Sequence, residues 1–362
     1  MKINNKDVPF YAKASLVFLG LFAFIATLYL TKRIIVPIIY STIIAIVLSP
    51  MVNFFVKKKM NRVLAITLTL TSVIFVTVLF IMLLSSQMMM FSDSFPKLIE
   101  KFHLLMGQSI SWISENFNIS TYKIHTWINQ KNTELLSGTS ALIGQTIINT
   151  GSVLVILILI PVYVFMILFY QPLLIEFVHR LFKPGDQSEV NEVLLATKKI
   201  IRSYLIGLLL EALIIATLNS VSLLILGIDY AVLLGVIGAI LNVIPYIGGI
   251  MAVSLPVIIA LATKPPSYCF FVILAYIIIQ FIDNHYIMPK VVASKVKINA
   301  LMSVIVVLAG GALWGVPGMF LSIPLTAIVK VIFDHIDPLK SWGFLLGDTM
   351  PAVGIFKMKT KK

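Results

Sequence analysis

The stretch 241-LNVIPYIGGIMAVSLPVIIAL-261 decides the fold that we expect for this chain. It is almost wholly apolar, yet two prolines, a Gly-Gly pair and one asparagine interrupt it. A peptide group left unpaired in hydrocarbon costs several kcal/mol, so non-helical backbone at membrane depth must be sheltered by protein or line a wet cavity. The stretch therefore predicts a re-entrant helical hairpin that turns between Pro245 and Gly249.

The composition places the chain in a membrane. Of its 362 residues 59% are hydrophobic and only 12% are charged, and apolar runs of nearly twenty residues recur along it. A soluble domain of this length needs more charged residues to cover its surface. The sequence predicts an all-α, polytopic integral membrane protein.

Several classes of function are disfavoured by what the sequence lacks. Cys269 is the only cysteine, which excludes an intrachain disulfide and any CxxC pair. No GxxxxGK[ST], HExxH or GxSxG pattern occurs, and the five histidines are dispersed. We expect no catalytic residues, no metal site and no cofactor, with H⁺ or Na⁺ as a coupling ion. The net charge of +13 does not indicate nucleic acid, because in a membrane protein the position of the positive charges sets the topology.

The positive charges predict the topology. The basic segment from Lys57 to Arg62 and the lysine-rich tail both read as cytoplasmic, whereas Lys32-Arg33 falls in a predicted outer turn, against the rule. The expected domains are three N-terminal spans in residues 1–84; an extracytoplasmic helical region, 85–150; a fourth span and a cytoplasmic amphipathic helix N-capped by Ser188, 151–204; a transport core with two hairpins, 205–335; and a cytoplasmic basic tail, 336–362.

A second interrupted segment repeats the first. It reads 300-ALMSVIVVLAGGALWGVPGMFLSIPLTAIVKVIF-333, a short apolar run, a Gly/Pro break and another apolar run with its own proline. One span, near residues 268–282, separates the two segments, so the hairpins would open to opposite sides and meet around a polar chamber. The predicted fold has about six full spans plus two inverted re-entrant hairpins, eight hydrophobic segments in all. Two plain kinked spans are the alternative.

Two acidic residues at membrane depth are candidate ion sites. Glu211 lies within the run LLLEALII, and Asp283 ends the span near residues 268–282. A charged carboxylate at the bilayer centre costs roughly 2.5–3.5 kcal/mol on insertion scales, so Glu211 should face the bundle interior or a wet cavity. We interpret it as a proton or cation site. A structural ion pair or an inter-subunit hydrogen bond is the alternative for Glu211, and a marker of the cytoplasmic interface is the alternative for Asp283.

Neutral polar side chains and aromatic residues complete the candidate path. Amides donate and accept hydrogen bonds without the full desolvation cost of a charge, so they suit a polyhydroxylated substrate, although each could instead bond loose carbonyls of a broken helix. Tyr246 and Trp314, beside the two breaks, could stack or gate, with simple packing as the alternative. The candidate amides are Asn219, Asn242, Gln280 and Asn284.

These motifs carry a family resemblance. The segments SYLIG (203–207), LGIDYAVLLGVIGAILNVIPYIGG (226–249) and NHYIMPKVVASKVKINALMSVIVVLAGGALWGVPGMFLSIPLTAI (284–328) resemble the autoinducer-2 exporter family of bacterial membrane proteins. The likeness covers nearly the whole chain. The matching positions are Asn242, Pro245, Tyr246 and Gly248; Asn284, Pro289 and Lys290; and Gly311, Gly315, Gly318 and Pro324. Gly249 stands where many members have proline, and Asp283 where glutamate is common.

The resemblance implies a homo-oligomer, a pentamer, in the bacterial cytoplasmic membrane with both termini cytoplasmic. It also implies elevator-like movement of a small solute or ion, since members are linked to export of the quorum-sensing signal autoinducer-2 and to sodium/proton exchange. We expect partners to be this substrate and membrane lipid, and no nucleic acid. The hypotheses are export of a small polar solute, cation/proton antiport, and a non-transporting scaffold for envelope assembly.

Overall fold

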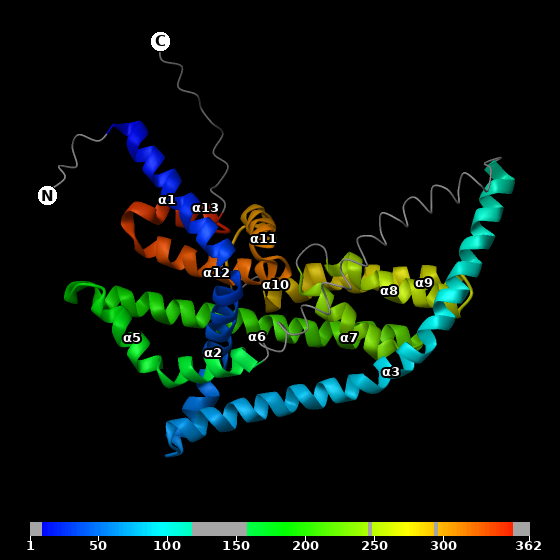
Figure 1. Ribbon diagram of the computed structural model, residues 1–362, viewed down its shortest axis with the longest axis horizontal. Helices are drawn as coiled ribbons and strands as arrows, with labels where there is room; N and C mark the ends of the chain where they lie inside the picture. The colour runs from blue at the N-terminus through cyan, green and yellow to red at the C-terminus, as the bar shows by residue number, and fades with distance from the viewer. Residues whose placement is uncertain (1–8, 118–157, 245–247, 293–295, 350–362) are drawn as a thin grey trace, which may run out of the picture.

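The computed structural model describes residues 9–117, 158–244, 248–292 and 296–349, and within these ranges the chain is helical with no strand (Figure 1). This confirms the all-α prediction. The helices are α1 (Phe10–Leu30), α2 (Lys32–Lys57), α3 (Arg62–Phe117), Ile158–Phe169, α5 (Gln171–Arg180), α6 (Gln187–Ile225), α7 (Ala231–Asn242), α8 (Gly248–Thr263), α9 (Ser267–Ile282), α10 (Met288–Val291), α11 (Ala300–Trp314), α12 (Val316–His335) and α13 (Lys340–Leu346).

Six of the described helices are long and apolar enough to cross a membrane. A seventh span results if Ile158–Phe169 and α5, which meet at an angle of 62°, count as one bent span. Large apolar side chains are exposed along these helices, and most of all along α1. Such a surface is stable in lipid and not in water, so the chain is a multi-pass membrane protein.

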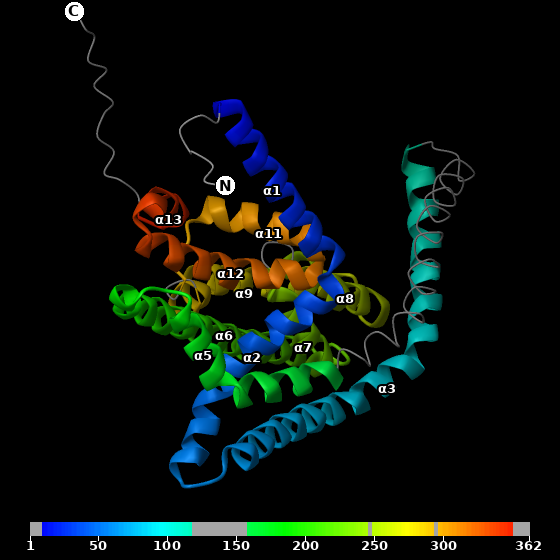
Figure 2. The same cartoon turned by 60° about the vertical axis from the view of Figure 1, so that its left-hand side comes forward.

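Helix α3 differs from the prediction, because it does not end near residue 84. It continues as one helix of 56 residues to Phe117, with Pro96 inside it. At 1.5 Å per residue this helix is about 84 Å long, more than twice the thickness of the hydrocarbon layer. Both views show its C-terminal part projecting away from the other helices (Figures 1 and 2). The rest of the predicted extracytoplasmic region, 118–150, lies outside the described residues.

Helix α6 also joins two predicted elements into one. The expected surface helix and the fifth span form a single helix of 39 residues. Asp186 occupies the N-cap position, so the prediction of Ser188 as the cap is wrong. The expected apolar face is confirmed where Val190, Ile201 and Tyr204 are buried. No proline interrupts α6, and its first half packs on α12 through Tyr204 instead of ending at a membrane surface.

The first interrupted segment forms an antiparallel hairpin of α7 and α8. Its two ends lie side by side, since a Cβ placed on Gly227 would lie 3.6 Å from Nζ of Lys264. Helices of 12 and 16 residues are about 18 and 24 Å long, too short for a hydrocarbon layer of about 30 Å. The two ends of the hairpin therefore lie together, as the hairpin prediction requires, and re-entry from one side of the membrane stays a prediction. Of the predicted turn, residues 245–247 lie outside the described ranges.

The second interrupted segment forms a hairpin of α11 and α12. The chain reverses at Gly315, whose φ of 68° is open to glycine, and Gly310 packs against Gly318 and Ser322. Helix α12, with 20 residues, is long enough to cross a membrane, whereas α11 has 15. The two hairpins are thus unequal, and re-entry of the second stays a prediction.

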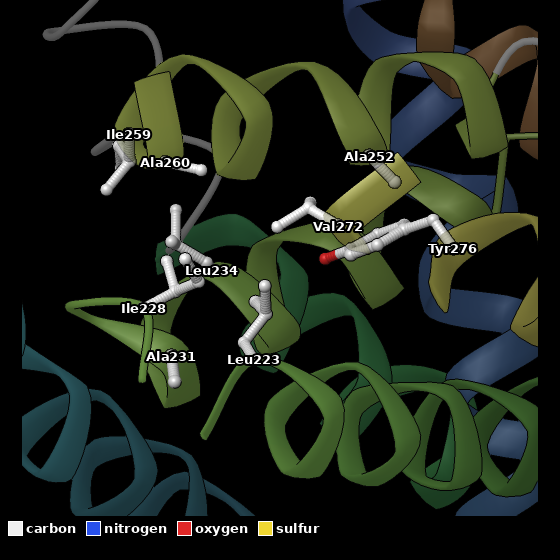
Figure 3. Close-up of a cluster of buried hydrophobic side chains, with 9 residues drawn as sticks. All are labelled: Leu223, Ile228, Ala231, Leu234, Ala252, Ile259, Ala260, Val272 and Tyr276. Atoms are coloured by element: carbon white, nitrogen blue, oxygen red, sulfur yellow. The ribbon is translucent and has the colours of Figure 1, made fainter. Parts of the chain in front are cut away.

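Each hairpin has its own packing partners. The first hairpin, α6 and α9 share a buried apolar cluster, drawn in Figure 3: Leu223, Ile228, Ala231, Leu234, Ala252, Ile259, Ala260, Val272 and Tyr276. The second hairpin packs on α2 and α6 through Leu321, Ile43 and Ile201, and it lies beside α1 (Figure 2). Burying such side chains contributes about 1.5–3 kcal/mol each. Helices α6 to α9 are therefore one packed unit around which a site can be built.

Candidate functional site

A buried acidic layer lies where α6, α7 and α9 meet. The side-chain amide of Asn242 donates a hydrogen bond of 2.8 Å to Oδ2 of Asp283. Asp283 is 2% exposed and Glu211 is 8% exposed, and the residues four positions from each, Ile279 and Ile215, pack in one apolar cluster. The structure therefore brings together three residues that are far apart in the sequence, the smallest separation being the 31 positions from Glu211 to Asn242.

Helical spacing turns this layer into a stack. Ile215 lies four residues after Glu211 on α6, and Ile279 lies four residues before Asp283 on α9. Both pack with Ala239 of α7 in an apolar cluster. Residues three or four apart share one face of a helix, so the next layer along the same faces contains Asn219 of α6 and Tyr276 of α9. The site is thus a sequence of polar, apolar and polar layers inside the α6, α7 and α9 unit.

Three buried polar atoms in these layers have no hydrogen-bond partner among the described residues: Oδ1 of Asp283, Oδ1 of Asn219 and the hydroxyl of Tyr276. The ion pairs formed within the described ranges involve other acidic residues, so neither Glu211 nor Asp283 has a Lys or Arg partner there. Two adjacent buried carboxylates without a cation are unfavourable. Binding a proton or a monovalent cation removes this cost, which is the chemistry that the acidic layer offers.

The chain after Asp283 has an unusual backbone. Asp283–Ile287 forms a π-helical turn between α9 and α10, a local widening that is frequent at functional sites. It places Asp283 inward while Asn284 is exposed. Nε2 of Gln280 donates to Oδ1 of Asn284 at 3.3 Å, and the Gln280 side chain lies against Gly249. Pro289 begins α10.

The remaining candidates lie elsewhere. Gly311, Trp314, Gly315, Gly318 and Pro324 belong to the second hairpin, and no hydrogen bond between described residues connects this group with the acidic layer. Trp314 faces α1, where its Nε1 donates to the carbonyl of Leu28 at 3.0 Å. The sequence alone could not separate the two groups, because both hairpins show the same Gly/Pro pattern. Pro245 and Tyr246 lie outside the described residues.

A cavity of about 320 Å³ lies beside the second hairpin. Three elements line it: α2, the helix Ile158–Phe169, and the break between α11 and α12. The lining residues are Lys32, Arg33, Val36, Pro37, Tyr40, Ile160, Trp314 and Pro317. The hydroxyl of Tyr40 donates to the carbonyl of Pro317 at 3.2 Å, which holds α2 against the break. The predicted gating position of Trp314 is therefore a packed position next to a cavity.

Sequence reasoning missed two tyrosines at the site. Tyr204 is buried on α6 seven residues before Glu211, a spacing that places both on one face of the helix. Tyr276 shares a face of α9 with Gln280 and Asp283, at intervals of four and three residues. That spacing was the available signal. It was not used because single tyrosines in apolar helices commonly pack in cores or at membrane interfaces.

Comparison with known proteins gives a consistent result. The model of a protein family described as "AI-2E family transporter" matches residues 18–337 of this chain. YueF of Bacillus subtilis (strain 168) is 24% identical over 337 residues, which cover 90% of this chain and 88% of that protein. The AI-2 transport protein TqsA of Escherichia coli (strain K12) is 24% identical over 333 residues, 87% of this chain and 90% of TqsA. YhhT of the same strain is 21% identical over 337 residues, 92% and 93% of the two chains.

Proposed function

Because this chain belongs to the AI-2E transporter family, we propose that it exports a small polar organic solute in exchange for protons that bind at Glu211 and Asp283. The membership and the six or seven possible spans make it a membrane transporter. The finer proposal is carried by one observation. Two buried carboxyl groups lie together without a Lys or Arg partner among the described residues, and one of their oxygens is unpaired.

The solute that we propose is an autoinducer-2-like signal molecule. TqsA is named as an AI-2 transport protein, and its similarity to this chain covers most of both chains. The amide of Asn242 lies in the acidic layer and that of Asn219 in the next polar layer of the same unit, and both suit the hydroxyl groups of such a molecule. Solute and protons would use the same unit of α6 to α9, which couples the two movements.

We propose an elevator-like mechanism in which this unit moves against the N-terminal helices. The first hairpin and α9 share one apolar cluster with α6, so they would move together. The first hairpin contacts α3, where the rings of Phe91 and Tyr230 meet edge-on with their centroids 5.4 Å apart, and α6 contacts α2, so the movement would have to shift both of these contacts. We place the chain in the cytoplasmic membrane with cytoplasmic termini, as a homo-oligomer of five copies. Native mass spectrometry of the detergent-solubilised protein tests the copy number.

Proteoliposomes test the transport proposal directly. Vesicles loaded with autoinducer-2 should release it faster when the outside is acidified, and a protonophore should remove the acceleration. Glu211→Gln and Asp283→Asn should lose this acceleration, because neither the Gln nor the Asn side chain can exchange a proton. Asp229→Asn is the matched control, since Asp229 is exposed in the turn before α7. A wild-type release rate that is the same with and without the proton gradient would overturn the proposal.

Cation/proton antiport is the second candidate, and the same carboxyl pair favours it, because adjacent carboxylates also bind Na⁺. The discriminating measurement uses vesicles without organic solute. A Na⁺ gradient alone should then move protons, seen with a pH-sensitive dye, in wild type and in Asp229→Asn but not in Asp283→Asn. Proton movement without solute identifies antiport, and its absence with solute-dependent movement identifies export.

A further inference from the structure

We propose that the second polar layer, formed by Asn219, Gly238 and Tyr276, binds one neutral hydroxyl group. This site is distinct from the acidic layer, from which Ile215, Ala239 and Ile279 separate it. The proposal rests on the proposed function only for the identity of a transported solute, and the site itself is argued from geometry.

The three residues converge on one point. A Cβ placed on Gly238 would lie 3.2 Å from Nδ2 of Asn219, 3.5 Å from the hydroxyl oxygen of Tyr276 and 3.5 Å from Cβ of Ala252. Gly238 is itself buried on α7, between α6 and α9. The polar ends of Asn219 and Tyr276 therefore both lie against the backbone of α7 at Gly238, where only glycine lets them approach without crowding.

The polar atoms around this point are incompletely paired. Asn219 is 2% exposed and Tyr276 is 7% exposed, and neither Oδ1 of Asn219 nor the Tyr276 hydroxyl has a partner among the described residues. Leaving a buried polar atom unpaired costs about 1–3 kcal/mol. A hydroxyl group both donates and accepts, so one such group would donate to Oδ1 of Asn219 and accept from the Tyr276 hydroxyl.

The surroundings select a neutral group over an ion. The layer has no acidic or basic side chain, and apolar residues lie on both sides of it: Ile215, Ala239 and Ile279 toward the acidic layer, and Leu223, Leu234 and Val272 on the other. Figure 3 shows the hydroxyl of Tyr276 pointing into this apolar cluster. A bare ion would lose its hydration there without a counter-charge. Two sources of a hydroxyl fit, a resident water and a hydroxyl of the transported solute.

The sign of one stability change tests the site without any transport measurement. If the Tyr276 hydroxyl is truly unpaired, Tyr276→Phe removes a costly group and the purified protein should unfold at a higher temperature. If the hydroxyl holds a bound hydroxyl group, the variant should unfold at a lower temperature, which is the result that we expect. Tyr286→Phe is the control, because Tyr286 is exposed near the end of the same helical stretch. An unfolding temperature of Tyr276→Phe that is unchanged or raised relative to wild type, both without and with added autoinducer-2, overturns the proposal.

Adding autoinducer-2 as the probe separates the two sources. With a solute hydroxyl in the site, the probe should raise the unfolding temperature of wild type but not of Tyr276→Phe, and the KM for release should rise about tenfold, the equivalent of one lost hydrogen bond. With a resident water, Tyr276→Phe should lower the unfolding temperature by the same amount with and without the probe, and the KM for release should stay unchanged. This second result, with no autoinducer-2 transport by wild type, would overturn the proposed solute and keep the site.

Gly238→Ala provides a second, independent variant. Its methyl group would lie 3.2 Å from Nδ2 of Asn219 and 3.5 Å from the Tyr276 hydroxyl oxygen, so it should crowd out a hydroxyl group bound between them and lower the unfolding temperature. Once the site is filled, removing the Tyr276 hydroxyl should no longer lower it further. The double variant Gly238→Ala/Tyr276→Phe should therefore unfold at a temperature close to that of Gly238→Ala alone. Fully additive shifts would mean that the two residues share no ligand, and would overturn the proposal.

Discussion

Asn242, the last residue of α7, donates a 2.8 Å side-chain hydrogen bond to Asp283, the first residue of the π-helical turn after α9. This bond joins the inner end of the first hairpin to the end of a spanning helix. Any change in the charge of Asp283 therefore acts directly on the hairpin. The bond gives a physical link between ion binding and movement of the segment whose broken helix the sequence predicts.

Asn242→Ala should destabilise the protein by about 1–3 kcal/mol, because it leaves a second oxygen of the buried Asp283 without a partner. The unfolding free energy is measured by SDS titration in mixed micelles. Asn53→Ala, at an exposed position of α2, is the control and should change little. The double variant Asn242→Ala/Asp283→Ala should lose less than the two single variants together. Strict additivity would show that the bond does not form.

Two adjacent glycines at the start of α8 should respond differently to alanine. A Cβ on Gly248 would meet the backbone of Leu241 and Asn242, which cannot move without opening the hairpin, whereas one on Gly249 would meet only the end of the Gln280 side chain, at 2.5 Å. Gly248→Ala should therefore abolish release from proteoliposomes, and Gly249→Ala should keep most of it after Gln280 turns aside. Equal activity of the two variants would contradict this packing.

The sequence predicts what each helix contains better than how helices meet. Glu211 and Asp283 stand out separately, because a carboxylate in an apolar run needs an explanation. Their placement in one layer does not follow from sequence, since spacing orders residues within one helix and does not say which helices face each other. The same limit hid Tyr276, whose importance comes from Gly238 on another helix.

Helix ends were the weakest part of the prediction. The boundary near residue 84 was placed where polar residues begin, yet a helix continues until a cap or a breaker ends it, and α3 continues to Phe117. Likewise, α6 runs through the border between the predicted surface helix and span near residue 204. The end of α7 at Asn242 and the reversal at Gly315 were predictable because glycine and proline act on the backbone itself.

Alanine substitutions at Gly315 and Gly20 should change the free energy of unfolding in opposite directions. Gly315 has space for a methyl group, but its φ of 68° and ψ of −149° are essentially restricted to glycine, so Gly315→Ala should cost about 1–3 kcal/mol. Gly20 lies within α1 with nothing near its Cβ position, so Gly20→Ala should stabilise α1 by about 0.5–1 kcal/mol. SDS titration measures both. Stabilisation by Gly315→Ala would show that the reversal has another backbone conformation.

Arg62 should be sensitive even to lysine. Its Nε and Nη2 donate to the carbonyl of Leu168 at 3.1 and 2.6 Å, and Nη2 also donates to Gln171 at 3.2 Å, which fixes the bend before α5. Lysine carries the same charge but cannot form this fork. Arg62→Lys should lose about 1–2 kcal/mol of unfolding free energy, based on two lost hydrogen bonds. Lys57→Gln, at an exposed position, is the control, and an Arg62→Lys protein as stable as wild type would indicate that only the charge matters.

The first hairpin should have both of its ends on one side of the membrane. Gly227 and Lys264 are neighbours in space, and α9 then carries the chain to the other side before Lys297. Single cysteines are introduced as Asp229→Cys, Lys264→Cys and Lys297→Cys in a Cys269→Ala background and treated with a membrane-impermeant maleimide in intact cells and in everted vesicles. The first two should react in the same preparation and Lys297→Cys in the other, with the cysteine-free protein as the unreactive control. Reaction of Asp229→Cys and Lys264→Cys from opposite sides would mean that α7 and α8 cross the bilayer as one kinked span, and the hairpin that holds Asn242 against Asp283 would have to be abandoned.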